Sequence, residues 1–211
     1  MNAVRYYVAL ILVILLPPVL CFWLLIHPFV RFWRRMGTGW TYGIVCSFMA
    51  LSMVGLFRIR HALLAVEFGT SYYLTALGLL PLSVSTWLGV VWFRRMRLRT
   101  IMGLPELAPD RYPQQLITTG VYAIIRHPRY VQLFLGLLGS ALIANYLVLY
   151  LAVALWLPGI YIIVRLEEKE LRERFGLAYD EYSRRVPRFL PRISRGSGPQ
   201  EVRVDTPPRE E

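Results

Sequence analysis

The stretch Gly120-Val-Tyr-Ala-Ile-Ile-Arg-His-Pro-Arg-Tyr130 is the densest run of polar residues inside the apolar part of this sequence, and an apolar segment begins directly after it at Val131. A residue that precedes proline is pushed out of the helical region, so His127 should be extended. Pro128 suits the first position of a helix, where its missing N–H costs nothing. The stretch therefore predicts a membrane helix with His127 near its N-cap, where unpaired N–H groups and the helix dipole favour an anionic ligand group. For the arginines alone, anchoring at the lipid headgroups is the alternative interpretation.

The composition indicates a polytopic membrane protein. Of the 211 residues, 56% are hydrophobic and the mean hydropathy is +0.45, which is too apolar for a soluble domain of this size. The net charge of +11 does not indicate nucleic-acid binding, because the basic residues lie between hydrophobic segments and in the C-terminal tail. They are better interpreted as topology determinants and as contacts with anionic membrane lipids. Cys21 and Cys46 both lie within hydrophobic segments, so we expect neither a disulfide framework nor a metal cluster.

Working outward from the opening stretch, the hydrophobic segments predict an all-α fold with five transmembrane helices. Residues 4–27, 38–57 and 72–93 are each long enough to span a bilayer, which takes about 20 apolar residues. Residues 131–164 are too long for a single span, because a helix rises about 1.5 Å per residue. They predict a C-terminal helical hairpin that turns at Asn145 and has two short arms.

Three regions follow from these segments. We expect residues 1–99 to form an N-terminal three-helix transmembrane part and residues 100–194 to form a core of loop, hairpin and C-terminal helices. Residues 195–211 are rich in Gly, Pro and charge, which predicts a disordered tail.

The distribution of Lys and Arg predicts the orientation in the membrane. Five crossings place the first and third connections on the same side as the C-terminus, and that side carries 21 of the 24 basic residues. Cytoplasmic loops carry the excess of positive charge. We therefore expect an integral protein of a bacterial inner membrane, with its N-terminus outside and both polar functional stretches, residues 94–130 and 165–211, in the cytoplasm.

The second polar stretch begins with Arg165 and places Glu167 and Glu168 directly after the last apolar residues. Ordinary pairs four residues apart, Glu168–Arg172 and Glu170–Arg174, would explain its later charges. They explain less well a carboxylate pair at the membrane edge, where ionisable groups are costly and often functional. Further along, Phe175-Gly176 indicates the end of this helix.

At this point the sequence resembles a known family. The motifs Gly120-Val-Tyr122, Arg126-His-Pro-Arg-Tyr130, Glu167-Glu168, Phe175-Gly176 and Arg185-Val-Pro187, in this order and spacing, are similar to those of the isoprenylcysteine carboxyl methyltransferases and the related phospholipid N-methyltransferases. The resemblance covers about residues 114–191. It implies an enzyme that uses S-adenosylmethionine, bound at the cytosolic side between the loop before the hairpin and the helix after it.

Carried over residue by residue, the resemblance implies a set of cofactor-binding positions and a smaller set of candidate catalytic residues. The cofactor-binding positions are Gln114, Gln115, Leu116, Ile117, Tyr122, His127, Pro128, Arg129, Tyr130, Glu167 and Tyr182, and the candidate catalytic residues are Glu167, Glu168 and Arg165. Gln114 replaces a histidine of the animal enzymes. We expect substitutions of Glu167 or His127 to weaken cofactor binding without unfolding the protein, because both interrupt the apolar segments rather than belong to them.

One departure concerns the substrate. The animal enzymes place an arginine one helical turn before the equivalent of Glu167, whereas this chain has Ile163 there and Arg165 on another face of the helix. Because an unpaired buried charge is heavily penalised, a prenylcysteine carboxylate does not follow as the acceptor. We expect a lipid-like acceptor that enters between helices from the bilayer and bears an amine, a thiol or a phospholipid headgroup.

The proposed chemistry agrees with the residue types. Methyl transfer from a sulfonium is an in-line displacement that needs positioning and a dry site more than acid–base groups. A carboxylate complements a cationic cofactor, and tyrosine rings can supply cation–π contacts. Two alternatives remain open: an NADPH-dependent membrane reductase, since sterol reductases have a similar Arg-His-Pro-x-Tyr element, and a non-catalytic membrane scaffold.

Overall fold

The computed structural model describes residues 2–26, 28–94, 104–108 and 115–192. All regular elements in these residues are helices, so the predicted all-α class is confirmed. The long helices are α1 (Asn2–Ile26), α3 (Thr38–Arg58), α5 (Tyr72–Phe93), α8 (Pro128–Ala144) and α9 (Leu147–Phe175). The short ones are α2 (Val30–Met36), α4 (Arg60–Leu63), α7 (Leu104–Leu107), the 3₁₀ turn η1 (Gly120–Ala123) and α10 (Leu177–Arg185).

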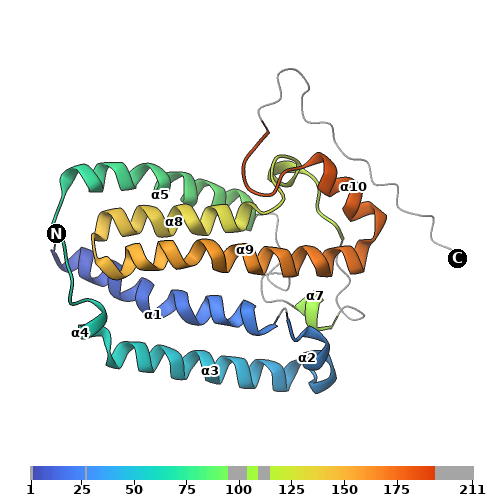
Figure 1. Ribbon diagram of the computed structural model, residues 1–211, viewed down its shortest axis with the longest axis horizontal. Coiled ribbons are helices and arrows are strands. Elements are labelled where there is room, and N and C mark those ends of the chain that lie inside the picture. Colours follow the sequence, from blue (N-terminus) through green and yellow to red (C-terminus); the bar gives the residue numbers. More distant parts are fainter. Residues whose placement is uncertain (1, 27, 95–103, 109–114, 193–211) are drawn as a thin grey trace, which may run out of the picture.

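The long helices form one elongated bundle (Figure 1). Four of them, α1, α3, α5 and α9, are long and apolar enough to cross a membrane, and α8 is an apolar helix of 17 residues. At about 1.5 Å per residue, α8 extends for about 26 Å, close to the hydrocarbon thickness. These helices identify an integral membrane protein with four to five spans, and their bounds agree with the predicted segments.

The predicted turn of the hairpin and its short first arm, the 17 residues of α8, are confirmed, but the prediction of a short second arm is wrong. Asn145 ends α8 in the left-handed conformation with φ 58°, which asparagine tolerates better than most residues. Helix α9 has 29 residues, about 43 Å, and it continues without interruption through Glu167 and Glu168 to Phe175. Its charged turns remain helical because they pack against α10 and pair with basic residues. The predicted helix end is confirmed at Gly176, which has φ 53°.

Helices α5 and α8 cross closely because small residues lie at their contact. A Cβ atom built on Gly139 would lie 2.7 Å from the carbonyl oxygen of Gly78, and one built on Gly136 would lie 2.8 Å from Oγ of Ser85. Close backbone approach through small residues is a common way of packing helices in membranes. This contact fixes α8, and therefore His127 at its start, against the N-terminal part of the chain.

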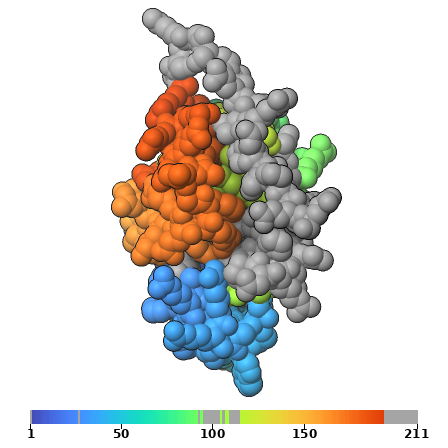
Figure 2. All heavy atoms as spheres, turned by 90° about the vertical axis from the view of Figure 1, so that its right-hand side faces the viewer, coloured from blue at the N-terminus to red at the C-terminus, as the bar shows by residue number. Residues whose placement is uncertain are grey.

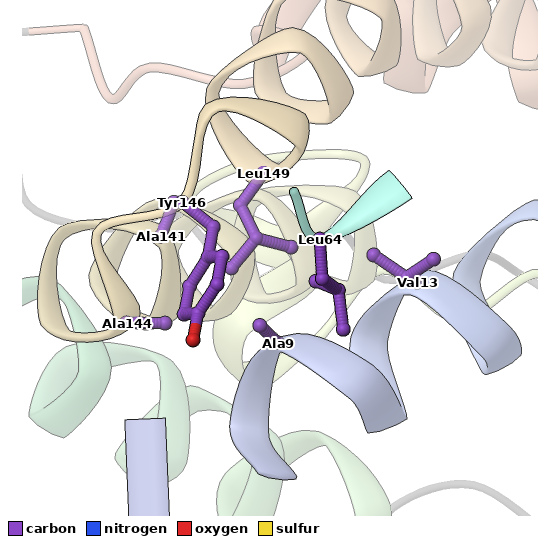
Figure 3. Close-up of a cluster of buried hydrophobic side chains, with 7 residues drawn as sticks. All are labelled: Ala9, Val13, Leu64, Ala141, Ala144, Tyr146 and Leu149. Atoms are coloured by element: carbon purple, nitrogen blue, oxygen red, sulfur yellow. The ribbon is translucent and has the colours of Figure 1, made fainter. Parts of the chain in front are cut away.

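A buried polar cluster closes the end of the bundle that carries the N-terminus. Arg5 is only 2% exposed, and its guanidinium donates to the Ala144 carbonyl at 3.0 Å and pairs with Glu67 at 2.8 Å. Around it, Ala9, Val13, Leu64 and Leu149 pack with Ala141, Ala144 and Tyr146 (Figure 3). Arg5 thus joins the first helix, the connection after α4 and the tip of the hairpin.

The opposite end carries α2, α10 and the start of α8. Arg34 of α2 pairs with Glu170 of α9 at 3.5 Å, and Arg31 pairs with Glu173 at 3.9 Å. Figure 2 faces this end and shows the C-terminal helices beside the first helices of the chain. The two polar stretches of the sequence meet here, as the five-span prediction requires. The predicted disordered tail, residues 195–211, lies outside the described residues.

Candidate functional site

Helix α8 starts where the sequence predicts, but the expectation of an extended backbone at His127 is wrong. His127 is the N-cap residue, with φ −123° and ψ 58°, and Pro128 is the first helical residue. The preceding turn depends on Gly120, whose φ of 64° is rare for residues with a Cβ atom. The expected unpaired N–H groups are partly satisfied by the chain itself. The amides of Arg126 and His127 donate to the carbonyls of Pro187 and Arg188 at 2.8 and 3.1 Å.

The buried carboxylate of Glu168 connects the start of α8 to helix α9 and to Arg188. Glu168 of α9 is 1% exposed, and its Oε1 atom lies 2.9 Å from Nη1 of Arg126 and 3.2 Å from Nε2 of His127. Nε and Nη2 of Arg188 donate to Oε1 and Oε2 of Glu168 at 2.9 and 2.8 Å. This fork-shaped pairing raises the pKa of Arg188 above its usual value. Glu168 therefore serves as the common acceptor for two arginines and a histidine.

Glu167 is placed differently, although it is the next residue along the chain. Its side chain is 32% exposed, and Oε2 accepts a hydrogen bond of 2.8 Å from the hydroxyl of Tyr130. The Nδ1 atom of His127 lies 3.9 Å from the same oxygen. The imidazole of His127 thus lies between an enclosed carboxylate and an open one. Of the two glutamates, only Glu167 is accessible to a ligand.

Helix α10 completes the site from the C-terminal side. The hydroxyl of Tyr182 donates to the carbonyl of Tyr122 at 2.7 Å, and Nη1 of Arg126 donates to the hydroxyl of Tyr179 at 3.2 Å. Burial, with the nearby Glu168 charge, raises the pKa of Tyr179 to about 12, and burial raises the pKa of Tyr182. Tyr182 is 3% exposed, which assigns its ring to the packing of α10 rather than to an open stacking surface.

The other residues predicted for the site differ in their burial and contacts. Leu116 packs against the buried residues of α10, Pro128 is buried, and the guanidinium carbon of Arg129 lies 4.9 Å from the ring centroid of Trp23. Gln115 and Arg165 are exposed, while Ile117 is partly buried. Gln114 lies outside the described residues.

A narrow apolar groove, with a cavity volume of about 10 Å³, begins beside this site. Its lining combines residues of α1, α8 and α9: Val19, Leu20, Trp23, Arg129, Tyr130, Leu133, Trp156, Ile160 and Ile163. Along α9 the lining residues 156, 160 and 163 follow the three- and four-residue steps of one helix face, and Glu167 is the next position of that face. The face of α9 that lines the groove therefore leads to the exposed carboxylate.

Two expectations from the sequence are wrong. His127 was expected outside the packing, but it is 4% exposed and its ring centroid lies 5.9 Å from that of Tyr130 and 6.0 Å from that of Phe189. The expected pair Glu168–Arg172 is replaced, since Glu168 turns inward and Arg172 bonds to Asp180 at 3.1 Å. The pair Glu170–Arg174 is confirmed at 2.8 Å.

The sequence interpretation missed Arg126 and Arg188 as members of the site. Both arginines lie within two residues of a proline, Pro128 or Pro187, but proline restricts only its own backbone and that of the residue before it, so this signal is weak. Nothing in the spacing alone pairs either arginine with Glu168.

Comparison with known proteins identifies the family to which this region is similar. Residues 73–178 match the phospholipid methyltransferase family, a region that includes α5, α8, α9 and the start of α10. The cobalt-zinc-cadmium resistance protein CzcN of Cupriavidus metallidurans is 32% identical over 76% of this chain and 74% of its own length.

Two further relatives match over shorter regions. The nickel-cobalt-cadmium resistance protein NccN of Alcaligenes xylosoxydans xylosoxydans is 37% identical over 40% of this chain, and the protein-S-isoprenylcysteine O-methyltransferase of Schizosaccharomyces pombe is 35% identical over 37%. The matched regions span 39% and 34% of those two relatives. No solved structure gives a significant match.

Proposed function

The chain belongs to the phospholipid methyltransferase family, and we propose that it transfers the methyl group of S-adenosylmethionine to a lipophilic acceptor at the end of the bundle that carries Glu167. The observation that carries the proposal is the position of Glu167. Its partly exposed carboxylate follows the groove-lining residues of α9 and lies beside the start of α8. A methyl acceptor from the membrane and a polar cofactor from the cytoplasm can meet at such a boundary.

The residues present fit this cofactor. Glu167 offers an anion to the cationic part of the cofactor or to its ribose hydroxyls, since carboxylates bind both. The start of α8, with Arg126 beside it, favours the carboxylate end of the cofactor. Arg126 is buried to 91% at its side chain, and its Nε atom has no hydrogen-bond partner within the described residues. When bound, the cofactor supplies an electrophilic methyl group, while the chain positions both reactants and excludes water.

The apolar lining of the groove, rather than its size, supports a lipid-like acceptor from the bilayer, and the side chains around it must move to admit one. Its walls are aliphatic and aromatic, and Arg129 and Tyr130 line it beside the polar site. Ile163 lines it at 1% exposure, whereas Arg165 is exposed and is not part of the lining. We therefore favour an amine, a thiol or a phospholipid headgroup over a prenylcysteine carboxylate. Location in a bacterial inner membrane, with the N-terminus outside and anionic lipids around the arginine-rich end, completes the proposal.

The direct test is calorimetry of the purified full-length protein with S-adenosylhomocysteine and, separately, with NADPH. We expect binding of S-adenosylhomocysteine, no binding of NADPH, and about 10- to 100-fold weaker binding of S-adenosylhomocysteine in Glu167→Gln. Binding of NADPH alone would assign the protein to the reductase class. If the protein binds neither compound, the result would support the alternative of a non-catalytic membrane scaffold.

The acceptor class can be tested by tritium transfer from labelled S-adenosylmethionine. Farnesylated N-acetylcysteine is compared with amines and thiols of matched hydrophobicity, and we expect turnover of the amines or thiols. Efficient turnover of the prenylcysteine that is abolished by Arg165→Ala would contradict the position we assign to Arg165.

A further inference from the structure

The segment after α10, Val186–Phe189, lies along the residues that lead into α8, and we call it the C-terminal strap. Its backbone accepts the amide hydrogens of Arg126 and His127, at 2.8 Å from Pro187 and 3.1 Å from Arg188. Phe189 packs beside the imidazole and against the cluster that contains Trp23 and Ile163. The strap therefore contacts both the polar site and the walls of the apolar groove.

The side chain of Arg188 connects the strap to Glu168. Both oxygens of Glu168 accept from the planar fork of Arg188, at 2.9 and 2.8 Å, so the carboxylate is fixed in its plane as well as in its position. Oε1 of this carboxylate is also the acceptor for Nε2 of His127. Glu168 is 1% exposed, so it is shielded from bulk water while Arg188 is in place.

The imidazole of His127 lies between Glu168 and the open carboxylate of Glu167. Nε2 lies 3.2 Å from Glu168, and Nδ1 lies 3.9 Å from Glu167. The rings of Tyr130 and Phe189 lie beside it at centroid distances of 5.9 and 6.0 Å. We propose that Arg188 is a positioning residue of the methyl-transfer site: it holds Glu168, and through Glu168 it orients His127 and the exposed Glu167. The inference rests on the proposed function for the identity of the ligand that Glu167 meets.

A purely structural role for Arg188 makes different predictions. If Arg188 only closes the fold, its loss lowers stability, and cofactor affinity changes only through the unfolded fraction. If Arg188 acts through Glu168, a folded variant without the guanidinium binds the cofactor more weakly. In a protein that already lacks Glu168, replacing Arg188 then has no further effect on cofactor affinity. Lysine keeps the charge but not the fork, so Arg188→Lys should lie between the wild type and Arg188→Gln.

The experiment measures the dissociation constant of S-adenosylhomocysteine for the purified full-length protein in detergent. The variants are Arg188→Gln, Arg188→Lys, Glu168→Gln, the double variant of Glu168→Gln with Arg188→Gln, and Arg192→Gln as the matched control. Arg192 is exposed and bonds to the carbonyl of Arg184 at 3.3 Å. We expect affinity to fall about 10- to 100-fold in Arg188→Gln, the loss of a charged hydrogen bond, with partial recovery in Arg188→Lys and no change in the control. The double variant should bind no more weakly than Glu168→Gln alone, because the two residues act in series.

A second measurement does not depend on the cofactor. Hydrogen exchange of the peptide 120–130 should become faster in Arg188→Gln than in the wild type. Without the Arg188–Glu168 pair the strap is held less firmly, and its carbonyls protect the amides of Arg126 and His127 less well. Arg192→Gln should leave the exchange unchanged. Additive losses in the double variant, or wild-type affinity and exchange in Arg188→Gln, would overturn the proposal. A wild type that binds no S-adenosylhomocysteine contradicts the proposed function instead, and the exchange experiment still decides whether Arg188 orders the start of α8.

Discussion

The two consecutive glutamates should respond in opposite ways to the same substitution. In Glu168→Gln the negative charge between Arg126 and Arg188 is removed, and two cations face each other across a neutral amide. The side chain of Arg126 is 9% exposed, so it cannot regain hydration without opening the site. Breaking a buried ion pair costs roughly 3–5 kcal/mol. The side chain of Arg188 is 32% exposed and can turn partly towards water, so we expect a loss near the lower limit, about 3 kcal/mol.

Glu167→Gln should be nearly neutral for stability. The side chain is 32% exposed, and the amide oxygen of glutamine can still accept from the hydroxyl of Tyr130. We expect a loss below about 1 kcal/mol, the net value of one ordinary hydrogen bond. Binding should show the reverse order, with S-adenosylhomocysteine affinity reduced about 10- to 100-fold. This ligand lacks the sulfonium, but its ammonium group or ribose hydroxyls would lose a charged partner.

The assay is equilibrium unfolding in mixed micelles with increasing denaturing detergent, followed by tryptophan fluorescence, together with calorimetry under native conditions. Wild type, Glu167→Gln and Glu168→Gln are compared at one micelle composition. Losses of stability that agree within about 1 kcal/mol for the two variants would refute the division between a buried and an open carboxylate.

Three further predictions test the fold. After Cys21 and Cys46 are replaced by serine, cysteines at Ala65 and Leu190 should be labelled from opposite sides of the membrane, and labelling of both from one side would contradict the five-span arrangement. Arg5→Met should lower the free energy of unfolding by about 2–3 kcal/mol, because the Ala144 carbonyl and Glu67 lose a charged donor, and an effect no larger than that of Arg58→Met at the same end would refute this. Gly139→Ala should cost about 1–3 kcal/mol because its Cβ would lie 2.7 Å from the Gly78 carbonyl, whereas Gly43→Ala, which meets nothing within 4 Å, should be neutral or slightly stabilising.

The local features of this fold could be predicted because they depend on short-range rules. The start of α8 at Pro128, the left-handed turn at Asn145 and the end of α9 before Gly176 each follow from the backbone preferences of one or two residues. The spans follow from hydrophobicity summed over about 20 residues, a signal strong enough to survive several internal prolines.

The partners of buried charges could not be predicted in this way. Glu168 has a suitable arginine four residues later, and the sequence favours that pair, but the carboxylate instead takes partners 41 and 20 residues away. Arg5 likewise appears in the sequence as one of the few basic residues of the outer side, yet it is 2% exposed and joins three segments. Which face of a helix is buried depends on packing between distant segments, and in a uniformly apolar membrane helix the sequence pattern does not mark that face.

Helical geometry explains why adjacent glutamates can take separate roles at one site. Successive residues of a helix point about 100° apart, so the face that lines the groove at Ile163 continues to Glu167, while Glu168 turns towards the start of α8 and the strap. A single carboxylate could not be both enclosed by two guanidiniums and open to a ligand. The tandem pair thus supplies an ordered support and an accessible anion within one turn of α9.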